Sequence, residues 1–190
     1  MEICALVLAG GKSSRMKGNN KAFLKYKSRT FIENIISELE NFNKIYISVD
    51  NKEKYKNLNY ELIEDEFEGI GPIGGIYSAL KVMSEDYVFV IACDMPKIKK
   101  KLTEVLLSNI EQGDKCVVFK DDAGRIYPLG GIYSKKSLPI IEEMIDSNNY
   151  KLQNLVERLD GKILSISECD LNYELFINVN NPEEYKNLNK

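Results

Sequence analysis

Short apolar runs alternate along the chain with longer runs whose apolar residues recur at helical spacing. The short runs are continuously apolar and rich in β-branched residues, which is typical of strands buried on both faces. They predict strands at Ile3–Leu8, Lys44–Asp50, Tyr60–Ile63, Tyr87–Cys93, Lys115–Lys120, Arg125–Ser134, Lys162–Ser167 and Phe176–Val179. The longer runs predict helices at Thr30–Phe42, Pro72–Met83, Lys101–Gln112, Leu138–Ser147 and Lys151–Leu159, and a short last helix that begins at Pro182.

This alternation predicts an α/β fold. Continuously apolar strands separated by helices favour a mostly parallel, Rossmann-like sheet with helices on both faces. The length of 190 residues and the lack of a linker-like segment suit a single domain spanning residues 1–190. A near-repeat, PIGGIYS at 72–78 and PLGGIYS at 128–134, falls at a predicted helix start and in a predicted strand. We interpret it as a coincidence and not as a duplicated unit.

The amino-acid composition excludes several classes of function. The chain has no His, which excludes a Ser-His-Asp triad, a Cys-His pair, a His zinc site and a His phosphocarrier. Its 26 basic and 29 acidic residues give a net charge of −3, so charge offers no reason to expect nucleic-acid binding. No apolar run approaches the ~20 residues of a membrane span, and no signal peptide precedes the first strand. Four widely spaced cysteines form no C-x-x-C pair and suit a reducing cytoplasm.

The segment Leu8–Ala22 (LAGGKSSRMKGNNKA) directly follows the first buried strand. In open α/β sheets, ligands bind at the carboxyl ends of the strands. Gly10 and Gly11 allow close approach of the backbone to an anion, and Arg15 and Lys21 add positive charge. The alternative is a tight turn with solvated basic residues, but the convergence of glycines, serines and cations favours a polyphosphate site.

Two better-known phosphate motifs do not fit. A P-loop ending at Gly11-Lys12-Ser13 would need glycine at position 6, which is Leu6. A G-x-G-x-x-G pattern does occur at Gly69, Gly71 and Gly74. It contains a proline and follows an acidic run instead of an apolar strand, so we reject it as a dinucleotide fingerprint.

Asp94 ends the strand YVFVIAC and is the best candidate for a metal ligand. One carboxylate together with nucleotide phosphates and waters satisfies the octahedral demand of Mg²⁺. The alternative for Asp94 is a turn or helix-capping role. Asp65 also follows a strand and could be an ordinary turn acid, and Asp50 is a weaker candidate.

The sequence resembles the molybdenum cofactor guanylyltransferases, the MobA family, which are nucleotidyltransferases of glycosyltransferase-A-like fold, related to nucleotide-diphospho-sugar transferases. The likeness is carried by LAGGKSSRM with Lys21-Ala22, IEDEFEGIGPIGG (63–75), ACDMP (92–96), YPLGGIYS (127–134) and INVNNPEEY (177–185), and covers nearly the whole chain. Three positions depart from the family pattern: Lys17 replaces the usual glycine, Asn20 the usual acid and Asn181 the usual threonine.

The resemblance implies transfer of GMP from Mg-GTP to the phosphate of molybdenum-molybdopterin, with transient contact with proteins that deliver the cofactor. It implies catalytic roles for Arg15, Lys21 and Asp94, with Mg²⁺ on Asp94, and nucleotide binding by Leu8, Ala9, Gly10, Gly11, Lys21, Asp65 and Asp94. It also places Asn180 near the crevice and makes the PLGGIYS strand and the NVN segment candidates for the acceptor pocket. Two alternatives stay open: a related transferase using CTP or another phosphate acceptor, and a GTP-binding regulatory module without catalysis.

Overall fold

Seven strands form one sheet in the computed structural model, which describes residues 1–10 and 20–188. Their order is β5 (Glu61–Glu64), β4 (Ile45–Val49), β1 (Ile3–Leu8), β6 (Tyr87–Ala92), β8 (Ile126–Ser134), β7 (Cys116–Lys120) and β9 (Lys162–Ser165). Within this sheet β8 runs antiparallel to its neighbours β6 and β7, and the other pairs of neighbouring strands are parallel. The expected α/β fold with a mostly parallel sheet is confirmed.

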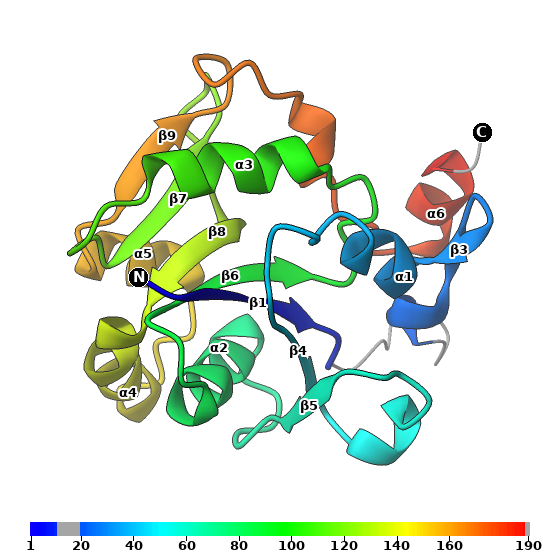
Figure 1. The fold of residues 1–190 in the computed structure, drawn as a ribbon, viewed down its shortest axis with the longest axis horizontal. Coiled ribbons are helices and arrows are strands. Elements are labelled where there is room, and N and C mark those ends of the chain that lie inside the picture. Colours follow the sequence, from blue (N-terminus) through cyan, green and yellow to red (C-terminus); the bar gives the residue numbers. More distant parts are fainter. Residues whose placement is uncertain (11–19, 189–190) are drawn as a thin grey trace.

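Helices cover both faces of this sheet (Figure 1). On one face lie α1 (Phe31–Ile36) and α3 (Lys100–Asn109), and on the other α2 (Pro72–Val82), α4 (Leu138–Asp146) and α5 (Leu152–Arg158). The sequence of β1 is continuously apolar because both faces of the strand are buried. Ala5 and Val7 belong to the first of two hydrophobic cores, whereas Leu6 and Leu8 belong to the second. The strand is buried from both sides because its side chains alternate between the two cores.

Helix α1 is shorter than its periodicity predicts. The capping box of Thr30 and Glu33 begins it as expected. After Ile36, however, the backbone bonds close three residues back: the amide of Leu39 donates to the carbonyl of Ile36 at 3.0 Å. The side chains of Leu39 and Phe42 are still buried. The apolar pattern therefore predicted the buried face correctly, although the last turns are not α-helical.

The predicted strand Phe176–Val179 is wrong. Tyr173–Phe176 forms a 3₁₀ helix, and 177–180 is an extended segment outside the sheet. The amide of Val179 donates to the carbonyl of Asp94, two residues beyond the end of β6, at 2.8 Å, so this bond extends no strand ladder of the sheet. That bond brings the end of the chain to the carboxyl edge of the sheet.

Helix α6 (Pro182–Leu188) follows this segment and lies beside β3 and α1 (Figure 1). The Tyr185 hydroxyl donates to the carbonyl of Lys25 at 2.8 Å, and its ring meets Phe31 edge-on. Lys25 belongs to a small hairpin of β2 (Lys25–Tyr26) and β3 (Arg29–Thr30). Further 3₁₀ turns lie at Lys21–Phe23, Lys52–Tyr55 and Lys135–Ser137. These contacts attach the chain terminus next to the segment that carries Lys21.

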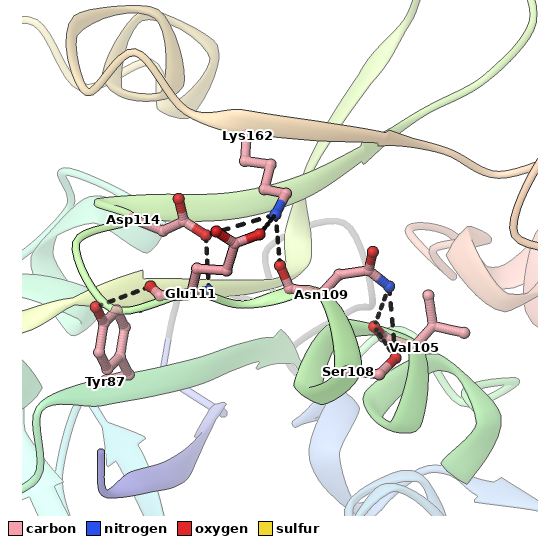
Figure 2. A network of polar contacts seen from close by, with 7 residues as sticks. All are labelled: Tyr87, Val105, Ser108, Asn109, Glu111, Asp114 and Lys162. Atoms are coloured by element: carbon pink, nitrogen blue, oxygen red, sulfur yellow. Dashed lines mark hydrogen bonds and ion pairs between the residues drawn. The ribbon is translucent and has the colours of Figure 1, made fainter.

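Lys162, at the start of β9, caps the carboxyl end of α3 (Figure 2). Its Nζ donates to the carbonyl of Asn109 at 2.7 Å and to Glu111 Oε1 at 2.9 Å. A cation there satisfies a carbonyl that the helix leaves unpaired and complements the helix dipole. The contact joins edge strand β9 to α3.

The cysteines are free thiols, and Cys4, Cys93 and Cys116 are buried. Burial raises the pKa of each of these three thiols to about 12, so they act as small apolar side chains. Within residues 1–10 and 20–188, every helix is too short or too polar to cross a membrane.

Candidate nucleotide-binding crevice

A cavity of about 660 Å³ lies at the carboxyl ends of the parallel strands. It is lined by residues at and after the ends of β1, β4, β5 and β6, by the beginning of α2, and by one residue each from the 3₁₀ helix Lys21–Phe23, from β8 and from the segment before α6: Leu8, Ala9, Gly10, Lys21, Ser48, Asp50, Asn51, Lys54, Asp65, Phe67, Glu68, Gly69, Gly71, Pro72, Gly75, Ala92, Cys93, Asp94, Leu129 and Asn178. The chain leaves β1 toward β4 on one side and returns as β6 on the other. This reversal is the position at which open α/β sheets bind ligands.

The floor of the crevice is the end of β1. The amides of Ala9 and Gly10 both donate to the carbonyl of Ser48, at 2.9 and 3.0 Å. A Cβ on Gly10 would lie 2.9 Å from the backbone nitrogen of Asp50, closer than side chains normally approach. Position 10 therefore accepts only glycine without backbone movement. The other two loop candidates, Gly11 and Arg15, fall in 11–19, outside the described residues.

Lys21 and Asp94 meet in the crevice. Lys21 Nζ lies 3.0 Å from Asp94 Oδ2 and also donates to Asn180 Oδ1 at 3.0 Å. The side chains of Lys21 and Asp94 are only 17% and 16% exposed, so solvent screens this pair less than a surface ion pair. The sequence predicted all three residues near the crevice, and the structure brings them into direct contact.

One carboxylate oxygen of Asp94 is left without a hydrogen-bond partner in the part of the chain that the structure describes. This atom is Oδ1, and it is buried. A buried carboxylate oxygen left unpaired is unfavourable unless a cation or ligand completes its coordination. No group of three or more Asp, Glu, Cys or His side chains gathers around a metal position within 1–10 and 20–188. The site thus fits a cation that takes one protein carboxylate and completes its shell with phosphates and water.

Asp65 lies on the opposite side of the crevice, after β5. Its Oδ1 accepts a hydrogen bond from Ser48 Oγ at 2.6 Å. Burial raises the pKa of Asp65, the Ser48 hydroxyl lowers it, and the charge of Asp50 raises it further. Asp50 is more exposed and pairs with Lys54 Nζ at 2.5 Å. These two carboxylates give that side of the crevice hydrogen-bond acceptors.

Helix α2 begins at the edge of the crevice, a contribution that residue-by-residue analysis of the sequence missed. Gly71 precedes the helix with a φ of 78°, and Pro72 occupies its first turn. A Cβ on Gly75 would lie 2.5 Å from Ser48 Oγ and 2.7 Å from Leu8 Cδ2. The absence of a side chain at Gly75 lets the helix approach the strand ends. The only sequence signal was the GPIGG segment within the family resemblance.

A second cavity of about 700 Å³ adjoins the first. It shares Pro72, Leu129 and Asn178 with the first cavity. Its other lining residues come from the chain after β6, the start of β8, the start of α5 and the segment before α6: Met95, Arg125, Ile126, Tyr127, Pro128, Tyr150, Lys151, Leu152, Gln153, Tyr173, Glu174, Phe176, Ile177 and Asn180. The predicted acceptor segments, the PLGGIYS strand and the NVN segment, both contribute to it.

Comparisons with known proteins agree with this geometry. Residues 5–163 match the family model described as a MobA-like NTP transferase domain. A relative from Clostridium perfringens, named as a probable molybdenum cofactor guanylyltransferase, is 38% identical over 98% of this chain and 96% of its own length.

Solved structures share the fold. The molybdopterin-guanine dinucleotide biosynthesis protein A of Archaeoglobus fulgidus superposes with a TM-score of 0.82 at 24% identity, covering 100% of this chain and 97% of that one. A 2-C-methyl-D-erythritol 4-phosphate cytidylyltransferase from Thermus thermophilus gives 0.71 at 16% identity, with 100% and 98% covered. Because the family model matches residues 5–163 and the C. perfringens relative is 38% identical over nearly the whole chain, the chain belongs to the MobA-like NTP transferase family of nucleotidyltransferases.

Proposed function

We propose that the protein transfers GMP from Mg-GTP to the terminal phosphate of molybdenum-molybdopterin, releasing pyrophosphate and forming the guanine dinucleotide cofactor. The observation that carries this proposal is the position of Asn180. Its amide oxygen accepts from Lys21 in the first cavity, and the same residue lines the second. A nucleotide in the first cavity and a phosphate-bearing acceptor in the second would meet beside Asn180. The name of the C. perfringens relative supports this choice of substrates.

Guanine suits the acceptor-rich side of the crevice. The carboxylates of Asp50 and Asp65 can accept hydrogen bonds from ribose hydroxyls and from the N1–H and N2 amino group of guanine. The nucleotide triphosphate would then extend toward Lys21, which supplies positive charge, and toward Asp94, which would hold the metal. In this proposal the backbone of Leu8, Ala9 and Gly10 lies between the two ends of the nucleotide and cradles it.

The reaction needs positioning more than proton transfer. The acceptor phosphate is already an anion at neutral pH, so one of its oxygens can attack the α-phosphorus without a general base. The new P–O bond forms as the bond between the α-phosphorus and the bridging oxygen breaks, and pyrophosphate leaves. Lys21 would offset the charge of the reacting phosphates, and Arg15 is proposed to do the same from the Gly-rich segment.

A divalent cation, which we propose is Mg²⁺, would be held by Asp94 through its unpartnered Oδ1. When bound, the cation would neutralise phosphate charge and orient the triphosphate. Asp94 in turn keeps Lys21 in place through its other oxygen. The free thiols suit a reducing compartment, and we propose the cytoplasm.

Pyrophosphate release tests the proposal. The assay compares GTP with CTP, each with and without molybdenum-molybdopterin, at fixed Mg²⁺. We expect release only with GTP and acceptor together. Preferential release with CTP would instead support the related cytidylyl transfer, and Mg-dependent GTP binding with no turnover on molybdopterin or other phosphate acceptors would support a regulatory module.

A further inference from the structure

Tyr55 is buried between Ala9 and Asn20, although it comes from a different part of the chain. It ends the 3₁₀ helix Lys52–Tyr55, which follows β4, and only 1% of its surface is exposed. Its ring packs against Phe23 with the centroids 5.4 Å apart. The phenol therefore has a fixed position between the end of β1 and the 3₁₀ helix that carries Lys21.

The Tyr55 hydroxyl joins the two sides of the Gly-rich segment. It donates to the carbonyl of Ala9 at 2.7 Å and accepts from Nδ2 of Asn20 at 2.7 Å. Ala9 belongs to the start of the segment and Asn20 to its end. One buried hydroxyl thus uses its single proton and a lone pair to hold both ends. Burial raises the pKa of Tyr55, which keeps the hydroxyl protonated at neutral pH.

Asn20 connects the Tyr55 hydroxyl to the 3₁₀ helix that carries Lys21. Its Oδ1 accepts from the amide of Ala22 at 3.0 Å and so caps the 3₁₀ helix Lys21–Phe23. Since Lys21 is the first residue of that helix, the orientation of Asn20 determines where Lys21 leaves the backbone. We infer that Tyr55 is a positioning residue for the nucleotide site: its hydroxyl closes the base of the Gly-rich segment through Ala9 and Asn20 and holds Lys21 against Asp94. The inference rests on the proposed nucleotide binding in the first cavity.

The same contacts give a physical reason for the amide at position 20. The proton of Tyr55 is donated to Ala9, so its oxygen needs a donor, which the Nδ2 of Asn20 supplies. An aspartate at this position, the residue class usual in the resembling family, would offer only acceptors when ionised. Because Tyr55 has a single phenolic proton, either the carbonyl of Ala9 or the new carboxylate would then lack a hydrogen-bond donor. Asn20 and Tyr55 therefore form a matched pair.

Calorimetric binding of Mg-GTP tests the inference on the full chain. Tyr55→Phe removes only the hydroxyl, and Asn20→Ala removes its partner. We expect either change to weaken binding about tenfold, the effect of losing one well-made hydrogen bond at a buried site. The double variant should bind as Asn20→Ala alone does, because Tyr55 acts on Lys21 through Asn20. In a Lys21→Met background, Tyr55→Phe should have little further effect.

Tyr46→Phe is the matched control. Tyr46 is equally buried and its hydroxyl donates to Glu85, away from both cavities. Its variant should bind Mg-GTP as the unaltered chain does. Unchanged affinity in Tyr55→Phe, additive losses in the double variant, or an equal loss with Lys21 already removed would each overturn the inference. If the unaltered chain binds GTP without transferring GMP, the proposed reaction fails while this comparison stays valid. If it binds CTP in preference, the same variants are compared with CTP.

Discussion

Lys21 Nζ lies 3.0 Å from Asp94 Oδ2, although 73 residues separate the two in the chain. The contact spans the end of β6 and the 3₁₀ helix that follows the Gly-rich segment. It leaves the second oxygen of Asp94 buried and unpaired. The pair therefore combines a cation for phosphate with a carboxylate oxygen available for a metal, and the charge of each stabilises the position of the other.

Asp94→Asn should reduce the rate of pyrophosphate release by about 100-fold, because an amide cannot replace the charge of a metal-binding carboxylate. The apparent affinity for Mg²⁺ should fall as well, so the measurement is initial rate against Mg²⁺ concentration. The amide keeps the shape of the side chain, and thermal unfolding checks that the fold is intact. Near-normal rates at ordinary Mg²⁺ would show that Asp94 does not hold the metal.

Lys21→Met should lower kcat/KM for GTP by about 100-fold, because a charge-assisted contact to phosphate is lost and Asp94 is left without its cation. Steady-state kinetics with GTP varied gives this value. Lys100→Met is a suitable control, since Lys100 pairs with Glu40 at the surface, 3.6 Å apart, outside both cavities. Equal kinetics in the two variants would rule out a phosphate role for Lys21.

Asp65→Asn should stabilise the fold and weaken nucleotide binding. Burial raises the pKa of Asp65 in the folded chain, so the folded state binds its proton more tightly than the unfolded state does. Stability then falls as pH rises from the ordinary aspartate pKa through the raised one, and the ionised carboxylate is unfavourable at neutral pH. Asparagine can still accept from Ser48 and removes that charge.

Urea unfolding at pH 7.5 and near pH 4 measures the effect of Asp65→Asn. The variant should be more stable than the unaltered chain at pH 7.5, and its advantage should shrink toward acid pH. GTP affinity measured at pH 7.5 should fall. A variant less stable at pH 7.5 would show that interactions with the ionised Asp65 carboxylate outweigh the cost of burying its charge.

Lys162→Met should lower the midpoint of urea unfolding while leaving the KM for GTP unchanged. The substitution uncaps the carbonyl of Asn109 and separates Glu111 from its cation (Figure 2). Lys100→Met again serves as the comparison, because that surface pair caps no helix carbonyl. If both variants unfold at the same midpoint, the contact to the end of α3 adds nothing beyond an ordinary surface ion pair.

Much of the fold could be predicted from local pattern. Continuously apolar runs gave the strands of the sheet within a residue or two, and the capping box at Thr30 located the start of α1. The error at Phe176–Val179 has a tertiary cause: an apolar extended segment becomes a strand only when it pairs with another strand, and this one bonds to Asp94, beyond the end of β6.

The sequence named the candidate residues of the site but not how they are arranged. Residue type and position after a strand pointed to Lys21, Asp65 and Asp94, and the family resemblance to Asn180. No sequence pattern indicated that Tyr55 would reach Ala9, because that contact depends on how the excursion after β4 folds back over β1. The roles of Gly11 and Arg15 stay predictions, since both lie outside the described residues.

The near-repeat PIGGIYS and PLGGIYS forms two different structures, which the sequence around each copy distinguishes. The first forms the start of α2 and the second lies within β8. Flanking sequence, with Gly71 before the first copy and an apolar strand-like run around the second, sufficed to tell helix from strand. Apolar periodicity, glycine positions and the lack of histidine thus determined fold class and the kind of chemistry, because these depend on local backbone preference and residue type. Only the tertiary structure decided which charges meet and which carboxylate oxygen stays unpaired, because those contacts join segments far apart in the chain.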